Sequence, residues 1–454
     1  MTEASIKETD CREAIDLLDR LLGVGVRKPG TAAKLPAVIR VIESLEPAGG
    51  MQFPVFPASY AGDGQNAPPV YDLNGIEYGP ELEVVHGKDR DRFRRHIVKA
   101  RQCTMDSPQS QANRTEVAFL EDEELRCLVP QASAKIPRAD GKKDEESILC
   151  LPHRIADFRV RLSDNMRDDV KTAISDFAKG DSLKLLRLMP TSIIFGFWDS
   201  RGDESQHKHA RLLLSRIDAF DVVPCAKHAI YSGPYSRDEF AEIVLANSEL
   251  AAASQDETER ETEETQSATA KNAAAKKAAF KKMAERGFTA APSEGLGGVL
   301  VQGKIERLAL LSLTDIARLS CRDNDSEAQK NLTNAARRYV FALAVLAEGH
   351  PRATGSHRLR SGCELVTKKD GPAIELRGGD AVYEDSAALH ALFTNRDLLI
   401  GVAKEAKKRL AIPDKLDDFV VSKEALRSDF DSASKVNKGS ADTKAGKGRG
   451  SRGK

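Results

Sequence analysis

The chain has 454 residues, of which 41% are hydrophobic, so it can bury a large core as one elaborated domain or as two or three domains. Its 69 Lys and Arg residues balance 69 Asp and Glu residues, which excludes a global positive field and requires that any basic face be offset by acidic patches. The 7 cysteines are scattered and contain no Cys-x-x-Cys pair, so we expect a protein of the reducing cytoplasm without disulfides or a metal site. No apolar run approaches the ~20 residues that span a bilayer, so we expect neither an export signal nor a membrane anchor. We also expect no cofactor.

The N-terminal part predicts a helix, a strand and a long loop. Residues 11–23 place apolar side chains at helical spacing between charged ones, which predicts an amphipathic helix. Residues 35–45 are rich in β-branched side chains and break at Pro47, which favours a strand that ends in a turn. Residues 51–83 are rich in Pro, Gly, Asn and Tyr. A loop of this length is usually functional or disordered, and both interpretations stay open.

Residues 110–125 begin with polar side chains that can cap a helix and continue with apolar ones at near-helical spacing. The predicted helix carries Gln111, Asn113 and Arg114 in its first turns. The helix dipole opposes an arginine near a helix N-terminus, so an exposed Arg114 is better explained by an anionic partner. That partner could be a phosphate or, equally, a carboxylate such as Glu116.

A second basic segment, residues 148–163, brings His153, Arg154, Asp157, Arg159 and Arg161 close together. Arginine and histidine can bind phosphate oxygens, and arginine can do so with two parallel hydrogen bonds. His153 and Asp157, four residues apart, could instead form an acid/base pair or part of a metal site. No further ligands stand at suitable spacing, so a solvated polar face is a stronger alternative than chemistry.

Residues 191–198 form an apolar run of strand length, which predicts a central strand. Gly196 lies inside it, where a close backbone or ligand would explain the missing side chain. Residues 199–202 predict a turn directly after Trp198. Arg201 would then either lie in a surface turn or point at a polyanion from a rigid strand end.

Residues 207–211 form a basic loop that leads into a second predicted strand, residues 212–223. The two strands would form a hairpin with Arg201, Lys208 and Arg211 near its connection, a plausible phosphate clamp. Residues 248–286 pass from an acidic run to Ala and Lys with few large apolar side chains, which indicates a flexible linker.

The C-terminal part predicts a glycine turn at 295–298, then a strand, or a strand and a short helix, within 299–319. Residues 331–349 predict a buried helix that stops at Gly349. A glycine-containing loop at 350–360 would carry Arg352, His357, Arg358 and Arg360 before a strand at 361–366. Residues 434–454 have the composition of a flexible basic tail.

The strands and helices at 35–45, 110–125, 191–198, 212–223, 331–349 and 361–366 follow the βαββαβ order of a ferredoxin-like or RRM-like α+β fold. The predicted domains are the N-terminal part of this palm at 1–250, a charged linker at 251–288, the part that completes the palm at 289–433, and the tail at 434–454.

Five sequence motifs together resemble those of one protein family. They are PTSIIFGFWDSRG at 190–202, SQANR at 110–114, LPHRIAD at 151–157, GLGG at 295–298 and LRSGC at 359–363. The first two are specific, whereas GLGG alone is weak. The chain resembles the backbone subunit of the type I-U, or I-G, CRISPR Cascade complex, a Cas-seven-like member of the RAMP proteins.

The resemblance implies an RRM-like palm with finger and thumb insertions and no catalytic activity. It implies polymerisation along a guide RNA (crRNA), which pairs with a target DNA strand. Further implied partners are other copies of the chain, the large subunit, a subunit that caps or processes the guide end, and a separate helicase-nuclease. The predicted RNA-binding residues are Gln111, Asn113, Arg114, His153, Arg154, Arg161, Arg201, Lys208, Arg211, Arg352, Arg358 and Arg360.

Two alternatives belong to other classes of protein. One is a metal-dependent nuclease or other hydrolase that uses His153 and Asp157, for which divalent-metal-dependent cleavage would argue. The other is a structural assembly protein that binds no nucleic acid, which absorbance at 260 nm of the purified protein would test.

Overall fold

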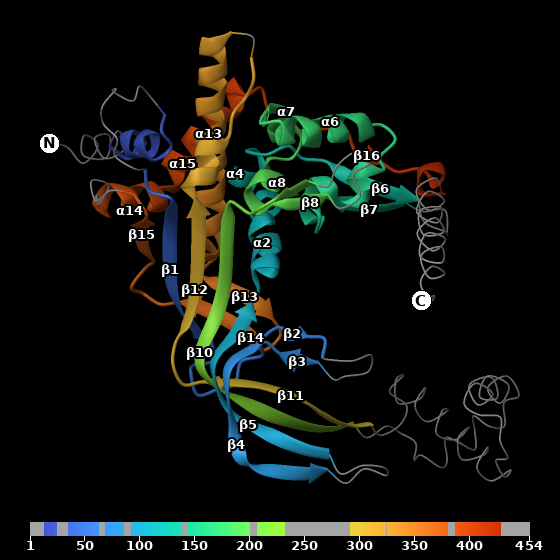
Figure 1. Ribbon diagram of the computed structural model, residues 1–454, viewed down its shortest axis with the longest axis vertical. Helices are drawn as coiled ribbons and strands as arrows, with labels where there is room; N and C mark the ends of the chain where they lie inside the picture. Colours follow the sequence, from blue (N-terminus) through green and yellow to red (C-terminus); the bar gives the residue numbers. More distant parts are fainter. Residues whose placement is uncertain are drawn as a thin grey trace, which may run out of the picture. The chain divides into compact units, whose positions relative to one another are not determined.

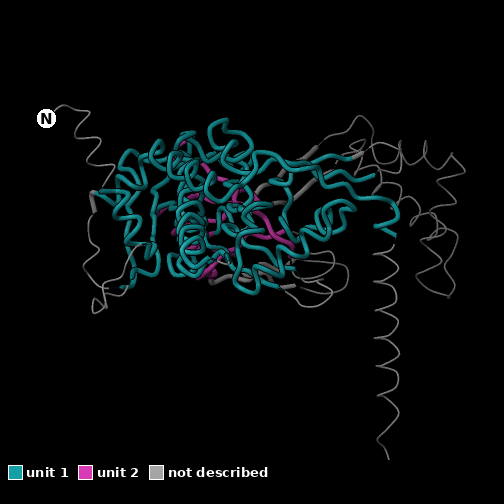
Figure 2. Tube along the Cα trace, turned by 90° about the horizontal axis from the view of Figure 1, so that it is seen from above, with its two compact units in different colours: residues 1–48, 104–219, 304–454 teal, residues 49–103, 220–303 magenta. Residues whose placement is uncertain are grey.

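The computed structural model describes residues 13–24, 35–62, 69–85, 92–137, 143–199, 207–231, 291–323, 325–379 and 386–427. The chain forms two compact units, each built from segments far apart in the sequence (Figure 2). Unit 1 comprises Met1–Ala48, Thr104–Ala219 and Lys304–Lys454, and unit 2 comprises Gly49–Cys103 and Phe220–Gly303. Unit 2 is therefore made of two insertions into the chain of unit 1. The predicted α+β class is confirmed, and the main sheet is antiparallel.

The main sheet of unit 1 is organised around β1 (Val38–Pro47), in the strand order β13-β14-β1-β12-β10. One edge of β1 pairs with β12, and β14 and β15 share its other edge. Exposure alternates residue by residue along β1 and β12, because successive side chains of a strand point to opposite faces. The other strands with residues in this sheet are β10 (Leu213–Tyr231), β12 (Ile305–Ser312), β13 (Ser356–Arg360), β14 (Cys363–Thr367) and β15 (Ala373–Arg377). The strands predicted at 35–45, 212–223 and 361–366 are confirmed.

The helices of unit 1 enclose one apolar core. Besides a helix at residues 13–21, they are α2 (Pro108–Glu116), α3 (Ala118–Glu121), α4 (Glu123–Arg126), α5 (Phe158–Arg161), α6 (Arg167–Ala178), α7 (Leu183–Leu188), α8 (Pro190–Phe195), α12 (Leu313–Arg318), α13 (Ser326–Thr354), α14 (Ser386–Thr394) and α15 (Arg396–Arg409), with 3-10 turns η1 (Ile148–Cys150) and η2 (Arg154–Ala156). The amphipathic helix predicted at 11–23 is confirmed for the described residues. None of the described helices combines the length and apolar character needed to cross a membrane.

The long helix α13 lies at the centre of this core and packs against α2, α8, α12, α15 and β13 (Figure 1). Its middle part is buried, as predicted for 331–349. Gly349 does not stop it, however. The helix continues to Thr354 and ends at Gly355, whose φ of 74° is the left-handed conformation that suits a glycine cap. The loop predicted at 350–360 is therefore wrong, because this segment forms the last turn of α13 and strand β13.

The central strand predicted at 191–198 is also wrong, because Pro190–Phe195 forms helix α8. All six residues are buried, and a short run that is apolar on every side suits a buried helix as well as a buried strand. Pro190 at the helix start has a φ preset for helix, and Gly196, with φ of 76°, ends it. Only Phe197–Asp199 is extended, as strand β8.

Strand β8 pairs with β9 (His207–His209) in a separate two-stranded sheet. The hairpin predicted between 191–198 and 212–223 is therefore wrong, since β10 pairs with β12 and β11 instead. Residues 191–198 therefore do not form the third element of the predicted βαββαβ order, and β10, which includes most of the segment predicted as the fourth element, pairs with β12. A three-stranded sheet contains β6 (Ser133–Pro137), β7 (Lys143–Ser147) and β16 (Phe419–Val420).

Unit 2 contains further strand pairs. β4 (Leu73–Val85) pairs with β5 (Arg92–Asp106), β11 (Ala291–Val301) pairs with the second half of β10, and β2 (Ser59–Tyr60) pairs with β3 (Val70–Tyr71). The segment 51–83 is thus not one long loop. The pairing of β4 shifts between Tyr78 and Leu82, and this irregularity accommodates the Gly-Pro pair that makes the sequence look like a loop.

The glycines at 295–298 lie within β11, so the predicted turn is wrong. The pairing with β10 shifts between Pro224 and Ala226, opposite these glycines. Gly298 has φ of 88°, and a Cβ there would lie 2.7 Å from the carbonyl oxygen of Val55. A bulge and a close backbone explain the glycine better than a turn does. The predicted linker and tail, 248–286 and 434–454, lie outside the described residues.

Candidate nucleic-acid interface

Helix α2 carries the first group of predicted binding residues. Ser107 caps it by accepting a hydrogen bond from the Ser110 amide at 3.3 Å, and Pro108 follows in the first turn. This start sets the faces of the helix. Gln111 is buried, whereas Asn113 and Arg114 are exposed.

The buried carboxylate of Asp106, directly before α2, gathers three of these side chains. It accepts hydrogen bonds from Gln111 at 2.7 Å, from Arg114 at 3.2 Å and from Arg360 at 3.2 Å. Arg114 also donates to the carbonyl oxygen of Leu359. Two guanidinium groups therefore share one carboxylate, at a surface where Arg114 and the neighbouring Arg358 are exposed.

Arg154 connects α2 to the segment around Gly196. Its guanidinium donates to Glu116 Oε2 at 2.7 Å, to Asn113 Oδ1 at 3.2 Å and to the Gly196 carbonyl at 3.3 Å, and it lies over the ring of Phe195. The backbone of Arg154 has φ of 53°, a left-handed conformation that disfavours a residue with a side chain. These contacts hold the residue in it.

Arg211 is the cation of this group without a protein partner in the part of the chain that the structure describes. Its Nε atom is buried and makes no hydrogen bond. Burial and the positive charge of Arg154 lower the pKa of Arg211. An unpartnered guanidinium beside a second one is unfavourable unless an anion joins them, since buried charges are normally paired.

Glu116 does not fully neutralise this pair. Burial raises its pKa to about 7, although the charge of Arg154 acts in the opposite direction. Near pH 7 the carboxyl group therefore compensates only part of the positive charge of Arg154 and Arg211. A phosphate could supply the missing negative charge.

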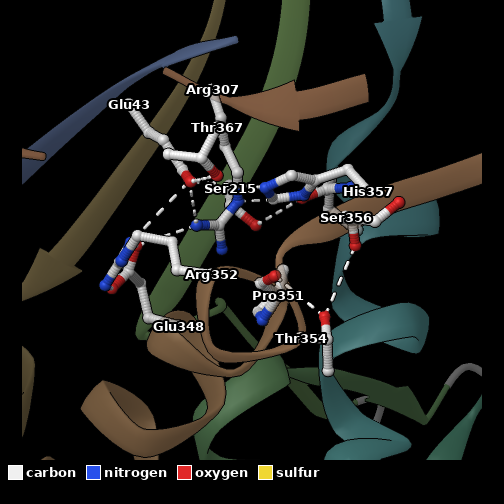
Figure 3. A network of polar contacts seen from close by, with 11 residues as sticks. Glu43, Ser215, Arg307, Glu348, Pro351, Arg352, Thr354, Ser356, His357 and Thr367 are labelled. Atoms are coloured by element: carbon white, nitrogen blue, oxygen red, sulfur yellow. Dashed lines mark hydrogen bonds and ion pairs between the residues drawn. The ribbon is translucent and has the colours of Figure 1, made fainter. Parts of the chain in front are cut away.

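Arg352 does not join the arginines around Asp106 and Glu116 but lies in a buried polar network (Figure 3). It forms two hydrogen bonds of 2.6 Å with Glu348 and lies 3.8 Å from Glu43. Arg307 joins the same two carboxylates at 2.9 and 3.2 Å, and its Nε donates to Gln111 at 3.2 Å. The contacts of Arg352 are those of a structural ion network.

The remaining predicted residues make other contacts or lie outside the described residues. His153 is exposed, and Arg161 pairs with Asp199 at 3.2 Å. Lys208 lies over the ring of Trp198, with its Nζ 5.7 Å from the ring centroid. Arg201 lies outside the described residues.

Asp157, considered with His153 for chemistry, caps α5 by accepting a hydrogen bond from the Arg159 amide at 3.1 Å. Its side chain is buried and also lies 3.5 Å from the Arg159 guanidinium. These contacts explain Asp157 structurally. Within the described residues, no group of three or more His, Cys, Asp or Glu side chains could hold a metal ion.

The sequence interpretation missed Asp106, Glu43 and Arg307. Glu43 and Arg307 occupy the buried phase of the alternation in β1 and β12 and lie directly opposite each other in the pairing. A charged residue in the buried phase of a strand is a usable signal, because such a charge requires a partner. Asp106 carries no comparable local signal, since its partners come from α2 and β13. The interpretation offered Glu116 as a partner for Arg114, whereas Glu116 binds Arg154.

The described residues thus define an α+β protein with a cluster of arginines around α2 that its carboxylates do not fully neutralise. Residues 39–224 match the family model described as CRISPR-associated protein GSU0053. The matched segment includes β1 from its second residue onward, α2, Arg154 and Arg211, and covers under half of the chain. The match supports a CRISPR-associated protein that has a role in antiviral defence and works with other Cas components. No curated protein matches the chain.

Proposed function

We propose that this chain is a guide-RNA-binding backbone subunit of a type I-U (I-G) CRISPR interference complex. Several copies would polymerise along the crRNA and present it for pairing with a target DNA strand. The large subunit and a subunit at the guide end would complete the complex in the cytoplasm, and a separate helicase-nuclease would cleave the target. The family match to residues 39–224 supports the CRISPR context of this proposal.

The topology supports an RRM-like palm as its fold. The strand order β14-β1-β12-β10 is antiparallel at every pairing, with α2 between β1 and β10 in the chain and α13 between β12 and β14. This is the arrangement expected of a βαββαβ unit. The two insertions that form unit 2 are then candidates for finger or thumb lobes.

The observation that carries the proposal is Arg211, which lies beside Arg154 and has no anionic partner among the described residues. A subunit that accepts any guide sequence must bind phosphates and sugars, because base edges differ between guides. A guanidinium excess suits phosphate oxygens, and it is local, as the neutral net charge of the chain requires. Arg114, Arg358 and Arg360 would extend this surface along α2.

The decisive variant is Arg211→Ala, with RNA affinity measured at several salt concentrations for two unrelated single-stranded guides. Affinity should fall about equally for both guides, and the slope of log K against log salt should decrease by roughly 0.7 for one lost phosphate contact. The melting temperature should stay unchanged or rise, because the substitution removes a charge that Arg154 repels and that has no anionic partner among the described residues.

The matched control is Arg318→Ala, since Arg318 is 80% exposed and pairs only with Asp315 of its own helix among the described residues. It should leave the salt slope unchanged. If Arg211→Ala lowers the melting temperature and leaves RNA affinity intact, Arg211 is an internal partner and the proposed interface is wrong. Loss of binding to one guide alone would contradict sequence-independent recognition.

We further propose that the chain performs no chemical step. Asp157 caps α5, so we assign it a structural role. The substitutions His153→Ala and Asp157→Ala should therefore not remove any catalytic activity. A divalent-metal-dependent nuclease activity of the purified chain that both substitutions remove would overturn this assignment and favour the hydrolase alternative.

A further inference from the structure

The two faces of the β8–β9 hairpin differ sharply. Phe197 pairs with His209, Trp198 with Lys208 and Asp199 with His207. Since successive side chains of a strand point to opposite faces, Phe197 and Asp199 share one face and Trp198 lies on the other. Phe197 and Asp199 are buried, whereas Trp198 is 59% exposed.

The inner face is held firmly. Phe177, Phe197 and His209 form an aromatic cluster with ring centroids 4.9 to 6.0 Å apart. His209 Nε2 lies 2.9 Å from the carbonyl oxygen of Ile193, and burial lowers the pKa of His209, so the ring is neutral at pH 7. Asp199 pairs with Arg161. The backbone that carries Trp198 is therefore fixed in place.

The outer face presents a flat aromatic ring together with a cation. Lys208 Nζ lies 5.7 Å from the centroid of the Trp198 ring, within the range of a cation–π contact. Since Trp198 is 59% exposed, much of the ring surface stays accessible to a ligand beside this contact. An exposed tryptophan on a rigid strand, beside a lysine, has the chemistry of a stacking platform for single-stranded nucleic acid.

The hairpin adjoins the arginine cluster directly along the chain. Gly196, whose carbonyl accepts a hydrogen bond from Arg154, immediately precedes β8, and Arg211 follows β9 after one residue. A Cβ at Gly196 would lie 2.8 Å from the His209 carbonyl oxygen, so both ends of the hairpin meet beside Arg154. The Arg154 side chain is only 5% exposed and its three nitrogens donate to protein acceptors, so Arg211 is the cation here that can reach a phosphate. A strand with a phosphate bound at Arg211 therefore has a base within reach of the hairpin.

We propose that Trp198 stacks on an unpaired base of the bound RNA strand and that Lys208 contacts an adjacent phosphate. This inference rests on the proposed RNA-binding function and adds a base contact to it. Stacking does not read base identity, because every base has an aromatic face, so the contact is compatible with any guide sequence.

The test uses the fluorescence of Trp198, the only tryptophan in the chain. Titration of the full-length protein with single-stranded RNA should quench this fluorescence and protect it from acrylamide. An abasic oligonucleotide of equal length should bind through its phosphates without the quenching. Trp198→Ala should weaken RNA binding by roughly 5- to 150-fold without changing the salt slope, and Trp198→Phe should retain most of the affinity.

Phe158→Ala provides the matched control, because Phe158 is 44% exposed and carries Arg159 over its ring at 5.5 Å but lies outside the hairpin. It should leave RNA affinity unchanged. If RNA binds with an Arg211-dependent salt slope while Trp198 fluorescence and the affinity of Trp198→Ala do not change, the stacking inference is wrong and the RNA-binding function stands. Absence of any RNA binding would overturn both, and a fluorescence change that depends on protein concentration alone would assign the hairpin to contact with a second copy.

Discussion

Replacement of Arg307 by methionine tests whether the buried network of Figure 3 stabilises unit 1 as its geometry indicates. The Arg307 side chain is 1% exposed, and those of Glu43 and Glu348 are 1% and 2% exposed. Methionine keeps much of the volume but leaves Arg352 as the nearest remaining guanidinium for both carboxylates. Breaking a buried ion pair by removing one partner costs about 3–5 kcal/mol, because the other charge stays buried.

The pKa of Glu43 gives an independent magnitude. Burial alone would raise this pKa, but the hydrogen bond from His357 and the charge of Arg307 lower it to about 2 from 4.5. A depression of about 2.5 pKa units corresponds to roughly 3 kcal/mol of stability. This contribution is present above pH 4.5 and is lost as the pH falls toward 2. Since Arg307 is one of several causes and Arg352 remains, we expect Arg307→Met to cost about 3 kcal/mol at pH 7.

The pH dependence supplies a second, sharper readout. Without Arg307 the pKa of Glu43 and Glu348 rises, so the folded variant takes up protons more readily than the folded wild type. The difference in unfolding free energy should therefore shrink as the pH falls from 8 to 5. Urea denaturation followed by circular dichroism at pH 5, 6, 7 and 8 measures it.

Two comparisons make the test decisive. Arg318→Met removes an exposed ion-pair partner and should cost under about 1 kcal/mol at every pH. Adding Glu348→Gln to Arg307→Met removes one of the two buried carboxylates that then share Arg352, and should restore part of the loss. A cost of Arg307→Met below about 1 kcal/mol, or a deficit that is the same at all four pH values, would refute this reasoning.

Further predictions concern α8 and its neighbours. Burial raises the pKa of Glu116 to about 7. The stability that its protonated form contributes is therefore present below pH 4.5 and is lost as the pH rises through 7. In urea denaturation, Glu116→Gln should make the unfolding free energy less dependent on pH in this range. Gly196→Ala should destabilise by more than about 1 kcal/mol, because φ is 76° and the clashing atom belongs to the backbone. Gly401→Ala should instead stabilise the protein by about 0.5–1 kcal/mol, because Gly401 lies inside α15 with open space around a Cβ. Stabilisation by Gly196→Ala together with destabilisation by Gly401→Ala would contradict both predictions.

Local pattern was sufficient where one periodicity dominates. β1 alternates between the core and the other face, and the middle of α13 is rich in Ala and apolar residues, so both were predictable from a window of about ten to twenty residues. Pattern failed for α8, whose six buried residues carry no period, and for β4, whose irregular pairing hides a strand behind a Gly-Pro pair. In both cases the deciding interactions come from elsewhere in the chain.

The candidate interface divides in the same way. The sequence by itself determined that Asn113, Arg114, Arg154 and Arg211 are of residue types that can bind phosphate. Its neutral balance required that any basic face be offset by acidic patches. Only the tertiary structure decided that Asp106 forms an ion pair with Arg114 and that Glu116 forms one with Arg154. It likewise decided that Arg211 has no partner among the described residues. The physical reason is that charge pairing depends on distances of a few ångströms between side chains that the chain brings together from far apart, and no local pattern encodes those distances.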